Sequence, residues 1–192
     1  MYMKSIVITG GLGYIGTELC KIYSGYSRYY KITVIDNKFS SSRVNQLRLW
    51  NIDFIQADIL DKSKIKKFIS KADVVHHLAG ITLVPKIKSE SDPEIEKKIR
   101  DIALQGTQNI LDLLQDDSKI IFPSTHVVYE GLKKIKLNIK ENEKTCPVLA
   151  YAKSKNDNEK QIKQSRKNFV ILRLGTVYGY SGDSTRMDIM PN

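Results

Sequence analysis

Short runs of apolar residues alternate along this chain with longer stretches in which apolar residues recur every three or four positions. The short runs are rich in Ile and Val and are mostly continuous, which is typical of strands buried on both faces of a parallel sheet. They predict strands at Ser5–Thr9, Ile32–Ile35, Asp53–Gln56, Val74–Leu78, Ile120–Pro123 and Val170–Leu174.

The stretches between the predicted strands have helical periodicity. Short helices are predicted around residues 15–22 and 65–69, a long one over about Glu94–Leu114, and another over Tyr151–Arg166. Regular alternation of strands and helices predicts an α/β fold, namely a doubly wound parallel sheet with right-handed crossovers.

Glycines are concentrated in TGGLGYIG (Thr9–Gly16), which joins the first predicted strand to the first predicted helix. Gly11, Gly13 and Gly16 match the G-x-G-x-x-G spacing of dinucleotide-binding turns, and Gly10, Gly13 and Gly16 form a variant with a three-residue period. Such a turn lets a pyrophosphate approach the backbone and the positive end of the helix. The sequence therefore predicts a dinucleotide-binding site.

An acidic residue at the end of the second strand supports this interpretation. Asp36 ends the run ITVID, twenty residues after Gly16. A carboxylate there accepts hydrogen bonds from the adenosine ribose hydroxyls and repels a 2′-phosphate, so NAD is the expected cofactor. Lys38 and Arg43 lie nearby in the sequence and keep NADP as the second possibility.

Together these segments resemble the extended short-chain dehydrogenase/reductase family, which includes the NAD-dependent sugar-nucleotide epimerases and dehydratases. The similar segments are TGGLGYIG, VIDN (Val34–Asn37), ADILD with Asp58, HHLAG (His76–Gly80), PSTHVVYE, YAKSK and LRLGTVYG. The resemblance implies an NAD-binding Rossmann fold, with cofactor contacts from Gly10, Gly13, Tyr14, Ile15, Gly16, Asp36, Asn37, Asp58, Ile59, Leu78, Ala79, Gly80, Tyr151 and Lys155.

The same resemblance implies that Thr125, Tyr151 and Lys155 are catalytic. Tyr151 and Lys155 are four residues apart on a predicted helix and share one face. A phenol ordinarily titrates near pH 10, and a neighbouring ammonium and a cationic nicotinamide both favour the phenolate that acts as a base. The residues expected to contact the substrate are Ser124, Thr125, His126, Tyr151 and Thr176.

The residues after Thr125 bear on the type of reaction. Dehydratases of the family place an Asp-Glu pair there, and decarboxylating members place a Glu second, whereas this chain has His126 and Val127. The resemblance thus implies an epimerase-type oxidoreductase acting on a nucleotide sugar, with a UDP-hexose as the expected substrate. The alternatives are a nucleotide-sugar ketoreductase or dehydratase, and a non-catalytic NAD-binding module.

Family members continue well beyond the equivalent of the last residue of this chain. Residues 1–178 are therefore predicted to form the NAD-binding domain, and residues 179–192 to begin a substrate-binding region whose remainder this chain lacks. In the family, the long helix and the tyrosine-bearing helix of two subunits pack together, so the resemblance implies a homodimer.

Composition restricts the choice of partners and location. The net charge is +10, but the lysines are scattered, so a solvated surface is expected rather than a nucleic-acid partner. No apolar segment is long enough to cross a bilayer, and no membrane partner is expected. Cys20 and Cys146 lack metal or disulfide spacing, which favours the cytoplasm. No metal site is expected, since adjacent His76 and His77 should point to opposite faces of their strand.

Overall fold

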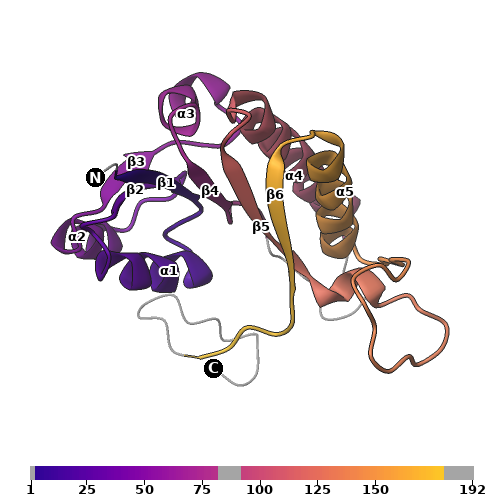
Figure 1. The fold of residues 1–192 in the computed structure, drawn as a ribbon. Coiled ribbons are helices and arrows are strands. Elements are labelled where there is room, and N and C mark those ends of the chain that lie inside the picture. Colours follow the sequence, from indigo (N-terminus) through magenta and orange to yellow (C-terminus); the bar gives the residue numbers. More distant parts are fainter. Residues whose placement is uncertain (1–2, 82–91, 180–192) are drawn as a thin grey trace.

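The computed structural model describes residues 3–81 and 92–179. A single sheet of parallel strands, in the order β3-β2-β1-β4-β5-β6, forms the centre of the molecule (Figure 1). The strands are β1 (Lys4–Thr9), β2 (Tyr30–Asp36), β3 (Asp53–Gln56), β4 (Val74–His77), β5 (Lys119–Thr125) and β6 (Asn168–Leu174). The predicted α/β fold with a doubly wound parallel sheet is confirmed.

Helices cover both faces of the sheet (Figure 1). One face carries α1 (Tyr14–Ser24) and α2 (Ser41–Leu49), and the opposite face carries α3 (Lys62–Ile69), α4 (Pro93–Leu113) and α5 (Ala150–Gln164). A short 3₁₀ helix, η2 (His126–Tyr129), directly follows β5.

Each face of the sheet has its own hydrophobic core, and β1 contributes to both. Ile6 and Ile8 pack into the core beneath α1 and α2, whereas Val7 packs into the core beneath α3, α4 and α5. Successive side chains of a strand point to opposite faces, so a strand covered on both faces needs apolar residues at nearly every position. This requirement explains the continuous apolar runs of the central strands.

Two elements were not predicted from the sequence, namely α2 and η2. Helix α2 buries only Val44 and Leu47 along its nine residues, which is too few to form a recognisable apolar stripe. The predicted helices and strands otherwise occur with small shifts at their ends. Helix α4 begins at Pro93, because the Asp92 side chain accepts a hydrogen bond from the Glu94 backbone and caps it.

The order of the strands reverses between β1 and β4, and this arrangement positions the site. The chain proceeds from β1 to β2 and β3 on one side, and from β4 to β5 and β6 on the other. In open parallel sheets, ligands bind outside the carboxyl ends of the strands at such a reversal. Thr9, His77 and Thr125 end β1, β4 and β5 at this edge.

Residues 180–192, most of the predicted second region, lie outside the described residues. The predicted boundary at residue 178 therefore stays a prediction.

Candidate active site

The glycine-rich turn after β1 is shaped first by the packing of the chain itself. Gly10 has φ +68°, and a Cβ atom there would lie 2.7 Å from the backbone nitrogen of Ala79. A Cβ on Gly16 would lie 2.6 Å from the Cα of Gly11. Glycine at these two positions is required by backbone conformation and close approach, whether or not a ligand binds.

Gly13 is less constrained, because its φ is ordinary and an added Cβ would have one close neighbour. It has φ −74°, is exposed, and a Cβ there would meet only the Gly10 carbonyl oxygen, at 3.1 Å. Gly13 is the N-cap of α1, which has no side-chain capping hydrogen bond and no acidic residue in its first turn. The positive end of α1 therefore faces a position that a phosphate can approach closely, so this turn fits a dinucleotide.

Asp36 links the end of β2 to this turn. Its carboxylate accepts hydrogen bonds from the backbone N–H groups of Leu12, at 3.0 Å, and Lys38, at 3.0 Å. Each carboxylate oxygen can accept more than one hydrogen bond, so acceptor capacity remains for a ligand diol. The predicted ribose-binding residue is thus held directly beside the glycine-rich turn.

The predicted adenine-side residues separate into two groups. Asn37 donates from Nδ2 to Asp58 Oδ2 at 2.9 Å, which joins the ends of β2 and β3 at the site edge. The Ile59 side chain instead turns away and packs on α4, where a Cβ on Gly106 would lie 2.3 Å from its Cδ1 atom. Any contact of Ile59 with a cofactor would therefore involve its backbone rather than its buried side chain.

The segment after β4 lies against the glycine-rich turn. The Ala79 N–H donates to Thr9 Oγ1 at 3.3 Å, and Leu78 N–H donates to the Thr9 carbonyl at 3.1 Å. Gly80 follows in open space. The predicted cofactor residues Leu78, Ala79 and Gly80 are thus brought next to Gly10, although they are about seventy residues away in the sequence.

His76 and His77 point to opposite faces of the sheet, as predicted. His76 Nε2 lies 2.7 Å from the Tyr23 hydroxyl on the α1 face, while His77 lies between Thr9, at 2.9 Å, and Thr107 of α4, at 3.1 Å. Burial lowers the pKa of His76 to about 4 and that of His77 to about 3, where the charge of Lys155 contributes as well. Both histidines are neutral packing residues at neutral pH.

The three predicted catalytic residues come from β5 and α5. Thr125 ends β5, and its Oγ1 accepts a hydrogen bond from the Val127 backbone at 3.2 Å. Lys155 extends from α5 to β5, where its Nζ donates to the Pro123 carbonyl at 2.8 Å and lies 4.4 Å from the centre of the Phe122 ring. Tyr151 lies one turn before Lys155 on α5, so it shares the helix face turned toward β5.

The environment of Lys155 changes its proton affinity. Burial lowers the pKa of Lys155 to about 8, from the ordinary 10.5. Perturbed titration of this kind is common at functional sites. Lys155 therefore lies on the predicted helix and has a pKa close to neutral pH.

The predicted substrate residues are not all on the open side of the site. His126 is exposed, with its Nδ1 donating to the Leu174 carbonyl at 3.2 Å, and Thr176 is exposed after β6. Ser124 is only 4% exposed, and its hydroxyl donates to Glu159 Oε1 on α5 at 2.6 Å. The Ser124 hydroxyl thus faces the interior, where it is engaged by α5.

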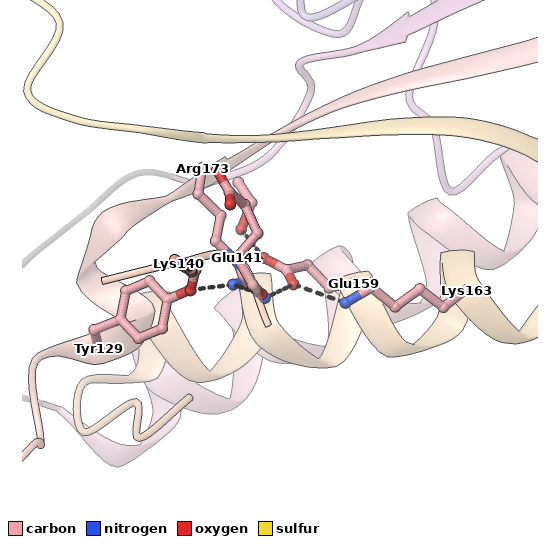
Figure 2. A network of polar contacts seen from close by, with 7 residues as sticks. Tyr129, Lys140, Glu141, Glu159, Lys163 and Arg173 are labelled. Carbon is pink, nitrogen blue, oxygen red and sulfur yellow. Dashed lines mark hydrogen bonds and ion pairs between the residues drawn. The ribbon is translucent and has the colours of Figure 1, made fainter. Parts of the chain in front are cut away.

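Glu159 is a residue that the sequence analysis missed. It lies on α5 at the spacing Tyr151, Lys155, Glu159, and this four-residue repeat is the signal that would have identified it. Figure 2 shows its carboxylate between Arg173 of β6 and Lys163 of α5. A cavity of about 530 Å³ adjoins Arg173 at this end of β5, lined in part by His126, Tyr129, Glu130, Lys140 and Glu141.

Within residues 3–81 and 92–179, no cluster of three or more His, Cys, Asp or Glu side chains is arranged to hold a metal ion. In the same part of the chain, no helix has the length and apolar character needed to span a membrane.

Comparisons with known proteins agree with this geometry. Residues 6–191 match the model of the NAD dependent epimerase/dehydratase family. A UDP-N-acetyl-alpha-D-glucosaminuronate decarboxylase of Bacillus cytotoxicus is 35% identical over 128 residues, which are 66% of this chain and 38% of that protein.

Solved structures of epimerases share the fold. The UDP-glucuronic acid 4-epimerase from Bacillus cereus, in complex with NAD, has a TM-score of 0.78 at 27% identity and covers 96% of this chain and 60% of its own. The UDP-N-acetylglucosamine 4-epimerase from Methanobrevibacter ruminantium M1, in complex with UDP-N-acetylmuramic acid, has a TM-score of 0.76 at 28% identity. The match covers 98% of this chain and 60% of that protein. This chain thus spans 38–60% of the length of these three proteins.

Substitutions at Gly10 and Gly13 should separate the packing requirement from the ligand requirement. Gly10→Ala forces a methyl group against the Ala79 backbone at an unfavourable φ, so we expect a loss of about 2 kcal/mol or more in the free energy of unfolding. Gly13→Ser introduces a preferred N-cap residue, so stability should stay within about 1 kcal/mol of the parent. The same side chain fills the approach to the turn and should weaken dinucleotide binding. Urea denaturation and calorimetric titration measure the two effects, and a Gly13→Ser protein as unstable as Gly10→Ala would contradict this division.

The pH dependence of stability should reveal the burial of Lys155. Its pKa falls from 10.5 to about 8 on folding, so between these values the unfolded chain binds more protons and the free energy of unfolding should rise with pH. Lys155→Met removes this contribution, so the stability of the parent should increase relative to the variant as pH rises through that window. Chemical denaturation of both proteins across the window is the measurement, and a constant difference between them would show that Lys155 is not buried as a cation.

Proposed function

Because the chain belongs to the NAD dependent epimerase/dehydratase family, we propose that it binds NAD and acts as an epimerase-type oxidoreductase on a nucleotide sugar. The observation that supports the proposal is the hydrogen bond from Lys155 to the Pro123 carbonyl, which brings the helix of Tyr151 and Lys155 against the strand that ends in Thr125. This strand end lies at the same edge of the sheet as the glycine-rich turn. A UDP-hexose is the proposed substrate class. The names of the related epimerases, which act on or bind UDP-linked sugars, support this choice.

The residues around the turn suit the parts of NAD. The exposed Gly13 and the N-terminus of α1 suit the pyrophosphate, and the Asp36 carboxylate suits the adenosine ribose diol. Asn37 and Asp58, which follow β2 and β3, would suit the adenine, and Ala79 and Gly80, which follow β4, would line the cofactor beyond the turn. When bound, NAD supplies the acceptor and donor of hydride.

The chain itself would supply proton transfer and orientation. Tyr151 would take the proton of the sugar hydroxyl that is oxidised, and Thr125 would orient that hydroxyl by a hydrogen bond. Lys155 places an ammonium one helical turn from Tyr151, which favours the phenolate electrostatically. Its hydrogen bond to the Pro123 carbonyl fixes the direction of its side chain along the end of β5.

The residues that follow Thr125 favour epimerisation over elimination of water, because they offer no available carboxylic acid. The two residues after Thr125 are His126 and Val127, which offer no carboxylic acid for loss of water. The next acid, Glu130, is engaged, because its Oε1 accepts the N–H groups of Val148 at 2.7 Å and Leu149 at 2.6 Å. Oxidation of a sugar hydroxyl to a ketone, followed by reduction of that ketone, needs no further acid, so it is the reaction that these residues support best.

A homodimer and a cytoplasmic location remain predictions. Helices α4 and α5 lie next to one another on one face of the sheet, with Gln161 Nε2 donating to the Leu104 carbonyl at 3.2 Å. The outer sides of these two helices are the surface that a second copy would cover, as the resemblance implies.

Cofactor preference tests the role of Asp36. We expect NAD to bind at least about tenfold more tightly than NADP, because the carboxylate accepts from a ribose diol and repels a 2′-phosphate. Asp36→Asn should narrow this preference while it preserves one acceptor for the Leu12 N–H. Calorimetric titration of both proteins with both cofactors is the measurement. Equal binding of NAD and NADP by the parent would contradict this role of Asp36 and would make Lys38 and Arg43 the expected determinants of cofactor preference.

Replacement of Tyr151 tests the catalytic proposal itself. Tyr151→Phe removes the proton acceptor but leaves Gly13 and Asp36 unchanged, so NAD affinity should change little. Interconversion of UDP-hexose epimers should fall by about 10²–10⁴-fold in a version extended to include a substrate-binding region, as is typical of lost general acid–base catalysis. Tyr29→Phe is the matched control, because Tyr29 is 51% exposed and lies just before β2, at the opposite edge of the sheet from the candidate site. Undiminished turnover in Tyr151→Phe would refute the assignment, and NAD binding without turnover in the parent would favour a non-catalytic module.

A further inference from the structure

Glu159 is a carboxylate buried within the molecule and paired on every side. It is 2% exposed, and its oxygens accept from Arg173 Nε at 2.9 Å, Arg173 Nη2 at 2.6 Å and Ser124 Oγ at 2.6 Å. Burial alone would raise the pKa of Glu159, but the hydrogen bonds from Arg173 and Ser124 outweigh it and hold the pKa below its ordinary value. Glu159 is therefore ionised at neutral pH, as the partner of Arg173.

The three residues join elements that carry the catalytic groups. Ser124 precedes Thr125 on β5 and is the register partner of Arg173 on β6. Glu159 lies on α5, one turn after Lys155 and two turns after Tyr151. A single carboxylate thus fixes the end of β5 that bears the threonine to the helix that bears the tyrosine and the lysine.

Arg173 extends the connection to the loop between Thr125 and Tyr151. Its guanidinium donates to the Tyr129 hydroxyl and to the Glu141 carbonyl, the latter at 2.8 Å, and it lies 5.1 Å from the Tyr129 ring centre (Figure 2). The Tyr129 hydroxyl in turn donates to the Lys140 carbonyl at 3.2 Å. The start and the middle of this loop are thereby connected to one ion pair.

We propose that Ser124, Glu159 and Arg173 form a positioning clamp that sets the placement of Thr125 relative to Tyr151 and Lys155. The clamp rests on the proposed function, because it places the groups that would transfer the proton. Ser124 acts here through Glu159 rather than by touching the substrate, which gives its inward-facing hydroxyl a role.

The chemistry of the clamp favours positioning over simple stabilisation. A buried ion pair stabilises a fold weakly, since desolvation offsets most of its Coulomb energy, and apolar residues of similar size often stabilise as well or better. Fixed directional bonds, in contrast, define where α5 lies along its own axis against β5. Apolar contacts such as those of Ile162 with the core are non-directional. Misplacement by about 1 Å costs up to about 10²-fold in rate.

Ser124→Ala is the variant that opens the clamp with the least disturbance, because the Glu159–Arg173 pair stays intact. In a version extended to include a substrate-binding region, we expect reduction of bound NAD by a UDP-hexose, followed in a single turnover by nicotinamide absorbance, to slow by about 10- to 100-fold. NAD affinity should remain that of the parent. Ser124→Thr, which keeps a hydroxyl donor, should restore the rate. A purely structural role would instead lower the fraction of protein able to bind NAD.

Lys163→Ala is the matched control. Lys163 also pairs with Glu159, at 3.5 Å (Figure 2), but its side chain is 52% exposed. The single-turnover rate in this variant should equal that of the parent. An equal loss of rate in Lys163→Ala and Ser124→Ala would overturn the proposal, because it would show a general effect of the charge around Glu159.

Amide hydrogen exchange tests the clamp without any turnover. Ser124→Ala should accelerate exchange in η2 and in the first turn of α5, while β1 and β2 keep parental protection. Parental exchange in both segments, or a uniform acceleration over the whole chain, would overturn the proposal. If no UDP-hexose reduces bound NAD in the extended parent, the proposed function fails, and the exchange experiment still decides whether the clamp holds β5 against α5.

Discussion

The close approach of Gly10 to the backbone of Ala79 joins the two halves of the sheet where the strand order reverses. A side chain at Gly10 would lie 2.7 Å from the Ala79 nitrogen, and the Gly10 N–H donates to the Ile35 carbonyl at 2.7 Å. The turn is therefore held between the ends of β2 and β4, and its remaining open side is the one at Gly13. Thus the packing of the backbone determines where an anion can approach, before any ligand is considered.

The fold could be predicted because its strongest signals are local. Strands covered on both faces must be apolar at nearly every position, so β1, β2 and β4 are recognisable as continuous runs. Gly10 and Gly16 are demanded by a turn whose spacing is visible in eight residues. Helix α2 lacks such a signal, since its two buried residues, Val44 and Leu47, do not form a periodic stripe, and its position depends on the sheet beneath it.

The candidate site could be predicted only in part, for a reason visible in its strands. Adjacent residues of a strand point to opposite faces, and this rule correctly separates His76 from His77. The same rule applies to Ser124 and Thr125, which cannot both face a substrate while they remain in β5. The resemblance grouped the two residues, whereas the structure turns the Ser124 hydroxyl to Glu159. That partner comes from another element, so spacing along β5 gives no sign of it.

Three buried ionisable groups near the end of β5 differ in how the loss of water around them is compensated. His77 stays neutral between two threonine hydroxyls, and Glu159 stays charged because Arg173 and Ser124 complete its hydrogen bonds. The Lys155 ammonium donates to a carbonyl oxygen and lies over an aromatic ring, and burial lowers its pKa to about 8. Of these three, Lys155 is the group whose proton is held loosely near neutral pH. Glu159 thus stays charged and His77 stays neutral around neutral pH. Lys155, beside Tyr151, is the residue whose protonation state can change close to that range.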